Sequence, residues 1–317
     1  MAHEQARGRS AERPGAIPKA GWRDILWRVK DEMSRDSLSL IAAGVAFYGL
    51  LALFPLISAL ISIYGLVVEP QVAQQQVAAL GEILPQQTRQ IVEEQLTRVT
   101  ASANNALGAG VIFGLLLTLW SAGAGTKALM EGLNIVNDEE EKRGFIKLNA
   151  VALGLTLGLI LFMILALALV AILPALIGML GLPSAVEEWA RWLRWPILAL
   201  AFVIALAALY RFAPSRSGPR WRWVTPGAVG ATVLWIIGSV LFSWYVSKFG
   251  SYNETYGSLA AVVVLMLWFW LSALIVLLGA EWNAETEHQT RADTTTGDER
   301  PLGERGAYVA DTVGQQP

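Results

Sequence analysis

The chain has 317 residues, of which 54% are hydrophobic and only 16% are charged, with a formal net charge of −2. Soluble globular domains carry about 25% charged residues, so this composition excludes an ordinary soluble protein. Cysteine is absent, which excludes disulfides, thiolate metal sites and thiol catalysis together.

The apolar residues are concentrated in six windows that contain no Asp, Glu, Lys or Arg. A helix of about 20 apolar residues crosses a bilayer, and it satisfies its backbone groups internally where water is absent. The sequence therefore predicts an all-α, polytopic membrane protein with six transmembrane helices. Their expected bounds are residues 38–66, 106–127, 148–173, 192–212, 224–247 and 257–280.

The positive charges are divided unevenly between the two faces that six spans create. Nineteen of the 24 Lys and Arg residues fall before the first span, in the second and fourth loops, or after the last span. Because basic loops stay in the cytoplasm, we expect both termini on the cytoplasmic side of the membrane. Anionic lipid headgroups are the expected counter-charge. The fourth loop contributes Arg211, Arg216, Arg220 and Arg222 without any acid.

Three segments lie outside the spans and their short connections. Residues 1–21 and 286–317 are rich in Gly, Pro, Thr, Gln and charged residues, so they are predicted to be disordered cytoplasmic tails. The membrane domain then covers residues 22–285. The extracytoplasmic first loop, about residues 69–105, is predicted to be helical, as either a lid over a cavity or a packed structural cap.

A short amphipathic helix is expected over residues 22–35. Trp22, Ile25, Leu26 and Val29 recur there at helical spacing. Such a pattern suits a helix that lies on the membrane surface and leads into the first span. A helix docked on protein is the alternative.

The sequence offers no cluster of residues for catalysis. Its two histidines, His3 and His288, both fall in the predicted tails, whereas a zinc hydrolase needs several ligands that converge on one metal. No glycine-rich phosphate loop is present, so ATP hydrolysis is not expected. We predict a protein that is not an enzyme and that holds no metal and no cofactor.

Polar residues at membrane depth or at helix ends are the candidate functional residues, because their burial is costly unless they pair or face water. Lys127 and Glu131 are one turn apart and can form an ion pair, and Asn134 continues the same face. The structural alternative for each candidate is a cap, an interhelical hydrogen bond or an interfacial anchor. The candidates along a substrate path are Asp36, Ser121, Lys127, Glu131, Asn134, Arg211, Tyr252, Asn253, Thr255, Tyr256, Glu281 and Asn283.

Over about residues 22–285 the sequence resembles the YihY/BrkB family of bacterial inner-membrane proteins. The matching stretches are AAGVAFY at 42–48, WSA at 120–122, LYRF at 209–212, WVTPG at 223–227, FGSYN at 249–253, TYGSL at 255–259 and GAEWNAE at 279–285. The last three are the most specific, since hydrophobicity does not dictate their polar residues.

The resemblance implies a six-helix inner-membrane protein with cytoplasmic ends, in agreement with the charge distribution. It implies no settled activity, because the ribonuclease BN name that some members carry looks like a misassignment. We expect a transporter driven without ATP, or a protein that translocates a lipid or an envelope precursor. The alternatives are a non-transporting scaffold for envelope machinery and a membrane-bound ribonuclease, which the missing metal ligands disfavour. Membrane lipids are the expected partners rather than nucleic acid, and a homo-oligomer or an envelope protein partner are left open.

Overall fold

The computed structural model describes residues 6–67, 120, 123–172, 184–248 and 258–316. Across these residues the regular structure is helical, apart from one isolated bridge between Pro219 and Thr295. The elements are η1 (Pro14–Ala16), α2 (Lys19–Arg35), α3 (Leu38–Val67), a helix over residues 123–136, α7 (Phe145–Leu167), the π-helical η2 (Ala168–Ile172), α9 (Ser184–Phe212), α10 (Trp221–Lys248), α12 (Ser258–His288) and α13 (Tyr308–Asp311). The described part of the chain is therefore all-α, as predicted.

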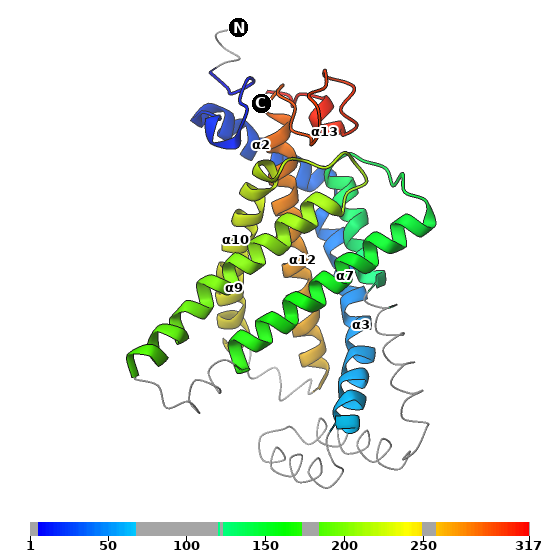
Figure 1. Ribbon diagram of the computed structural model, residues 1–317, viewed down its shortest axis with the longest axis vertical. Coiled ribbons are helices and arrows are strands. Elements are labelled where there is room, and N and C mark those ends of the chain that lie inside the picture. Colours follow the sequence, from blue (N-terminus) through cyan, green and yellow to red (C-terminus); the bar gives the residue numbers. More distant parts are fainter. Residues whose placement is uncertain (1–5, 68–119, 121–122, 173–183, 249–257, 317) are drawn as a thin grey trace. The chain divides into compact units, whose positions relative to one another are not determined.

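The chain forms two compact units, one made of Met1–Ala46 with Thr126–Pro317 and the other of Phe47–Gly125. The smaller unit contains most of α3, where the rings of Phe47 and Tyr48 meet edge to face with centroids 5.7 Å apart. The larger unit contains α2 and the helices from α7 to α13 (Figure 1).

Four helical segments are long and apolar enough to cross a membrane: Phe145–Val170, Trp192–Phe212, Trp221–Lys248 and Val262–His288. The helix pair formed by α2 and the beginning of α3, bent by 62°, brings the number to five if it is one span. These helices overlap the predicted spans 3 to 6 and span 1. The predicted second span lies mostly outside the described residues. A multi-pass membrane protein is confirmed.

A sharp break separates α2 from α3. Asp36 is the C-cap residue of α2, and Ser37 after it has φ +53°, in the left-handed region that favours glycine. On α2, Ile25 and Val29 are buried in a cluster with Trp223, whereas Leu26 is exposed. α2 is therefore docked on other helices through part of its predicted apolar face.

α10 and α12 cross at two glycines. A Cβ added at Gly227 would clash with the carbonyl oxygen of Gly279, and one at Gly279 would clash with the hydroxyl of Tyr210. Tyr210 of α9 donates its hydroxyl hydrogen to the carbonyl oxygen of Val276 at 2.8 Å. Three helices thus meet at a point where only residues without side chains fit, and the glycines set the distance between them.

A row of aromatic rings crosses the larger unit from helix to helix. Phe162 of α7 contacts Phe202 of α9, with ring centroids 5.7 Å apart, and Phe202 contacts Trp235 of α10 at 5.2 Å. Trp235 contacts Trp268 of α12 at 5.5 Å. The rings bury large apolar areas and join all four helices.

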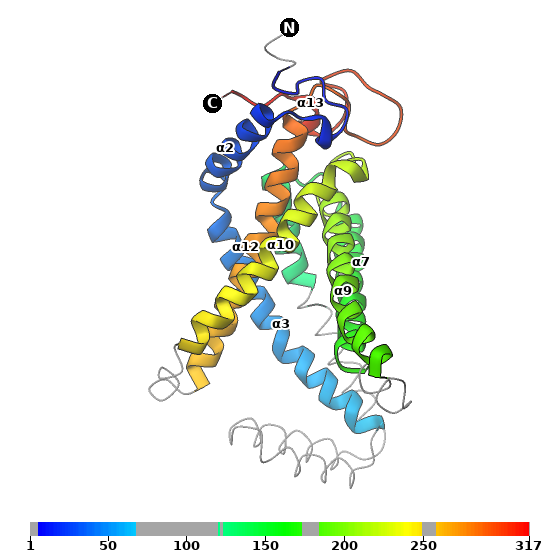
Figure 2. The same cartoon turned by 90° about the vertical axis from the view of Figure 1, so that its left-hand side faces the viewer.

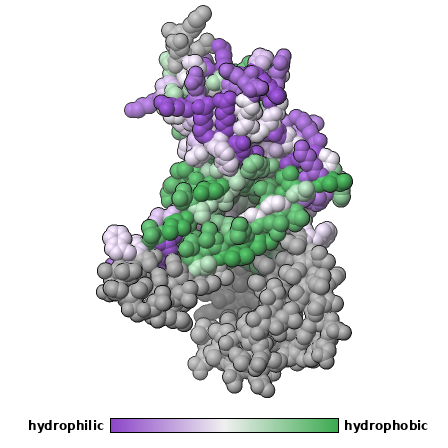
Figure 3. Space-filling model, viewed as in Figure 1, coloured by the Kyte–Doolittle hydropathy of each residue, from purple (hydrophilic) through white to green (hydrophobic). Residues whose placement is uncertain are grey.

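The outer surfaces of these helices are apolar and exposed. Figure 3 shows hydrophobic residues covering α7 and α9. Leu161 and Trp192 are examples of large exposed side chains on the two helices. A soluble protein avoids so large an apolar surface, so these faces are the ones that contact lipid.

The C-terminal segment differs from the predicted disordered tail over 286–317. α12 continues to His288, and the chain then folds back beside α2 and ends after α13 (Figure 2). The Arg305 guanidinium donates hydrogen bonds to the carbonyl oxygens of Arg291 and Ala310 at 2.8 and 2.7 Å. Composition was misleading because hydrogen bonds to backbone carbonyls hold this segment, and hydropathy does not register them.

The glycine crossing predicts that Gly227→Ala lowers stability by about 1–3 kcal/mol, the usual cost of overpacking. The measurement is the melting temperature of the purified protein in detergent. Gly158→Ala on α7 is the matched control, since a Cβ there would meet nothing within 4 Å. Equal melting temperatures for the two variants would contradict the close crossing.

Candidate functional site

Hydrophilic residues gather at one end of the larger unit (Figure 3). We call this end the polar cap and define it as residues 6–37, 137–144, 213–220 and 285–316. Its buried charged residues are Arg9, Asp24, Arg28, Glu139, Glu285, Glu287, Asp293 and Arg305. Because buried charge is costly unless it is paired, the pairing of these side chains decides how the cap holds together.

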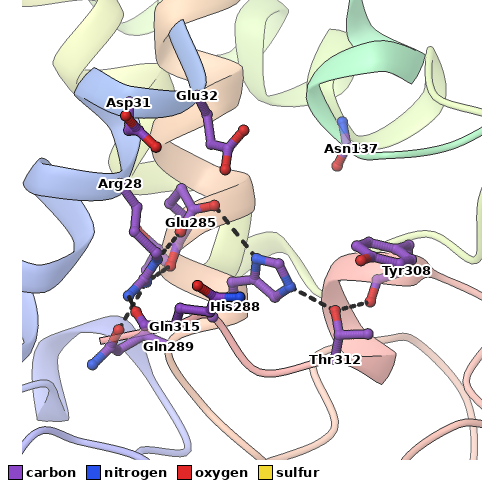
Figure 4. Close-up of polar contacts among 12 residues, drawn as sticks. Arg28, Asp31, Glu32, Asn137, Glu285, His288, Gln289, Tyr308, Thr312 and Gln315 are labelled. Atoms are coloured by element: carbon purple, nitrogen blue, oxygen red, sulfur yellow. Dashed lines mark hydrogen bonds and ion pairs between the residues drawn. The ribbon is translucent and has the colours of Figure 1, made fainter. Parts of the chain in front are cut away.

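Arg28 of α2 is the centre of one buried group. Its guanidinium forms an ion pair with the Glu285 carboxylate of α12 and donates a hydrogen bond to Gln289 Oε1 at 2.8 Å (Figure 4). It also donates to the carbonyl oxygen of Gln315 at 3.1 Å. Arg28 thereby joins α2, the end of α12 and the C-terminal segment.

His288 ends α12 and extends this group toward α13. Its Nδ1 lies 3.4 Å from Glu285 Oε1, and its Nε2 lies 2.5 Å from Thr312 Oγ1 (Figure 4). The imidazole ring meets the Tyr308 ring edge to face, with centroids 6.0 Å apart. His288 is thus a link within the polar cap and not part of a disordered tail.

A second buried ion pair joins Arg216 to Glu287. One guanidinium nitrogen of Arg216 donates to both carboxylate oxygens at 2.8 Å, and both side chains are no more than 2% exposed. Arg216 also donates to Asn137 Oδ1 at 2.9 Å, and Thr294 donates to Glu287 at 2.8 Å. The pair ties the loop between α9 and α10 to α12 and to the loop that follows residue 136.

Asn134, a predicted candidate, connects two loops of the cap. Its Nδ2 donates to Glu141 at 3.2 Å, and its Oδ1 accepts a hydrogen bond from the backbone N–H of Ser215 at 2.7 Å. Arg143 donates to the same Glu141 carboxylate at 2.6 Å. Hydrogen bonding from Arg143 above all, assisted by Asn134, lowers the pKa of Glu141 to about 2.

Asn283, another predicted candidate, fastens α12 to α10. Its Oδ1 accepts from the backbone N–H of Gly227 at 2.7 Å, and its Nδ2 donates to the carbonyl oxygen of Val224 at 3.0 Å. Pro226 lies between these two residues inside α10 and has no N–H of its own. The amide of Asn283 therefore supports the turn of α10 that contains the proline, and it brings the WVTPG and GAEWNAE stretches together.

Glu281, two residues earlier on α12, is 2% exposed and its Oε2 has no hydrogen-bond partner. Asp36 lies near enough to feel the negative charges of Glu32 and Asp138. Asp36 and Glu281 therefore form an acidic group near the junction of α2 and α3, beside the Arg28 group. Among the described residues, no three His, Asp or Glu side chains are arranged to hold a metal ion.

The structure places the remaining candidates as follows. Arg211 donates to the carbonyl oxygen of Pro219 at 2.5 Å and stacks on Trp221, so it shapes its own loop. Lys127 and Glu131 are both described, but no ion pair joins them, and Glu131 is exposed. The other five candidates lie outside the described residues: Ser121, Tyr252, Asn253, Thr255 and Tyr256.

The buried arginines and their partners were not among the predicted candidates. Arg28 lies between Ile25 and Val29 on the buried face of α2, and an arginine in that position is a sign of a buried partner. Glu285 follows Glu281 by four residues, so both lie on one face of α12. For Arg216 and Glu287 no comparable signal exists, since each lies in a segment that composition alone describes as polar.

Removing the cation of the second pair is expected to be costly. Arg216→Met leaves the Glu287 carboxylate buried without a cation, with the Thr294 hydroxyl still bound to it, which costs about 3–5 kcal/mol. The double variant Arg216→Met/Glu287→Met should recover much of that loss, because no charge is then stranded. Thermal unfolding in detergent measures both, with Arg35→Met as control, since its ion pairs with Asp31 and Glu32 are exposed. Equal losses from the single and double variants would contradict the pairing.

The lowered pKa of Glu141 predicts a dependence on pH. The charged form is stabilised in the folded protein, so its contribution is fully present above the ordinary pKa of glutamate and disappears as pH falls toward 2. Glu141→Gln should therefore lower the melting temperature at pH 7, and the difference from the parent protein should shrink between pH 5 and pH 3. A difference that stays constant over this range would contradict the stabilisation of the charged form.

Comparisons with known proteins agree with this picture. The profile of the virulence factor BrkB family matches residues 29–302. A ribonuclease-like protein, YfkH, of Bacillus subtilis (strain 168) is 35% identical over 249 residues, which cover 77% of this chain and 88% of that protein. The UPF0761 membrane protein VV1_0885 of Vibrio vulnificus (strain CMCP6) is 27% identical over 276 residues, 82% of each chain. No solved structure matches the chain.

The matched region includes α3, α7, α9, α10 and α12 and about half of the polar cap. A relative named as a membrane protein aligns with 82% of this chain, whose helices include four that are long and apolar enough to cross a membrane. The chain therefore belongs to the BrkB family of multi-pass bacterial membrane proteins.

Proposed function

We propose that this protein moves or gates an amphipathic substrate, a lipid or an envelope precursor, across the bacterial inner membrane without hydrolysing nucleotide. In this proposal six spans cross the membrane, both termini are cytoplasmic, and the polar cap is the cytoplasmic face. The 19 basic residues assigned to one face by the sequence support that orientation.

The observation that carries the proposal is a difference between the two halves of the helices. At the cap, buried ion pairs and Asn283 hold α2, α10 and α12 together. Beyond the row of aromatic rings, the outer parts of α9 and α10 are exposed, as at Trp189 (75%) and Trp244 (62%). Figure 2 shows α10 diverging from α9 away from the loop that joins them.

This asymmetry suits a protein that is closed at the cytoplasmic end and accessible from the bilayer. An amphipathic substrate needs an apolar surface for its tails and a polar one for its head. The exposed faces of α9 and α10 supply the first. The acidic group around Asp36 and Glu281, at the inner end of the helices, supplies polar groups that the ion pairs do not use.

A non-transporting scaffold is the second candidate, and the folded C-terminal segment is the observation that favours it. Residues 289–316 present an ordered surface that a partner could bind. Ribonuclease activity finds less support, because His288 is engaged with Glu285 and Thr312 and the described residues offer no metal site.

Reconstitution into vesicles that contain a fluorescent phospholipid tests transport against scaffolding. A transporter should speed exchange of the lipid between leaflets over vesicles that hold an unrelated membrane protein. The Lys127→Ala/Asn253→Ala variant should be several-fold slower, whereas Lys147→Ala/Asn253→Ala, which alters an exposed lysine of α7 instead, should retain more activity. Exchange at the rate of the unrelated protein would refute lipid transport.

A further inference from the structure

The N-terminal segment and the beginning of α10 border a pocket of about 510 Å³ that opens to the surface at the polar-cap end of the larger unit. A volume of this size accommodates a small-molecule headgroup. The lining residues are Gly8, Ser10, Ala11, Glu12, Arg13, Ala16 and Arg222. Three of the seven are Gly or Ala, whose small side chains leave the space open.

The wall of the pocket is a fixed part of the fold. Buried Arg9 donates to the carbonyl oxygen of Gly314 at 2.6 Å, and Thr290 donates to the carbonyl oxygen of Ala11 at 2.7 Å. Gly8 has φ +82°, and a Cβ there would come within 2.8 Å of a side-chain atom of Pro18. These contacts hold the coil before η1 against the C-terminal segment, so the pocket does not depend on a loose tail.

Three of the four arginines in the loop before α10 are engaged within the protein. Arg211 binds a backbone carbonyl and stacks on a tryptophan, and Arg216 is paired with Glu287. Arg220 donates to the carbonyl oxygen of Thr295 at 2.8 Å. The expectation that this loop as a whole faces lipid headgroups therefore applies to Arg222 alone.

Arg222 and Arg13 line the pocket from opposite parts of the sequence. Within the described part of the chain, neither guanidinium has an ion pair, a hydrogen bond or an aromatic partner, and both residues are exposed. Ser10 adds a hydroxyl group, and Glu12 is the single acid of the lining. The pocket is therefore lined by two guanidinium groups without partners in the described residues and by one hydroxyl group. These are hydrogen-bond donors of the kind that bind the oxygens of a phosphate group.

The position of Arg222 indicates the source of such a phosphate. It is the second residue of α10, whose apolar stretch crosses the membrane, and it follows the exposed Trp221. Tryptophan and arginine at the end of a span lie at the level of the lipid headgroups. We propose that this pocket is a binding site for the phosphate group of an anionic membrane lipid.

The proposal concerns equilibrium binding and does not depend on transport. A soluble phosphate ester offers the same chemistry, so the experiment must separate the two sources. The full-length protein, purified in a mild detergent, is titrated with phosphatidylglycerol, with phosphatidylcholine and with glycerol 1-phosphate, and binding is followed by native mass spectrometry.

We expect phosphatidylglycerol to bind more tightly than phosphatidylcholine. Arg13→Gln and Arg222→Gln should each weaken its binding about tenfold, since each removes charge-assisted hydrogen bonds. Arg23→Gln is the matched control, because Arg23 is an exposed arginine of α2 that does not line the pocket. Glu12→Gln should strengthen binding by removing the one repelling charge.

Ala16→Phe fills the pocket without altering any charge and should abolish the preference for phosphatidylglycerol. This variant and Glu12→Gln leave every ion pair of the cap intact. They therefore test phosphate binding in the pocket even if an arginine variant unfolds. Glycerol 1-phosphate binding with the same pattern of variants would support the phosphate site and assign it a soluble ligand. Equal binding by Arg222→Gln, Arg23→Gln and Ala16→Phe would overturn the proposal.

Discussion

The fold of the polar cap depends on the cost of leaving a buried charge alone. α12 carries Glu285 and Glu287 into a buried region, and each of these carboxylates needs a cation. Arg28 comes from the N-terminal helix and Arg216 from the loop between α9 and α10, and each meets one carboxylate. Three distant parts of the chain, α2, α12 and the loop between α9 and α10, must therefore be in place together. These ion pairs fix the relative positions of the three parts more than they add net stability.

The same constraint acts on backbone groups where α10 crosses α12. Pro226 lacks an N–H in the turn where α10 crosses α12, and backbone groups at a close helix crossing cannot reach water. Asn283 supplies both a donor and an acceptor to that turn. The glycines at 227 and 279 make the approach short enough for the amide to reach. The proline, the two glycines and the asparagine thus act together to hold α10 against α12.

The C-terminal segment shows how a polar sequence becomes ordered without a large apolar core. Asp293 accepts hydrogen bonds from Thr295 and from the backbone of Arg300, and Arg305 donates to backbone carbonyls on either side of it. Glu139 accepts from the backbone N–H of Tyr308 at 2.8 Å and so fixes α13 to another loop. Satisfied polar groups of this kind impose a single arrangement, although each contributes little net stability.

Hydropathy alone determined the membrane class and the all-α fold, because charged residues are excluded from the hydrocarbon of a bilayer and the apolar helices therefore appear as charge-free stretches of sequence. It also indicated Asn134 and Asn283 as polar groups that needed partners. Which partners they have was decided only by the tertiary structure, since Ser215 and Gly227 lie more than 50 residues from the side chains that they contact. The pairing of Arg28 and Arg216 and the folding of the C-terminal segment were decided in the same way. Ion pairs and hydrogen bonds form between groups that are close in space. The separation of two residues along the sequence does not reveal whether they are close in the folded protein.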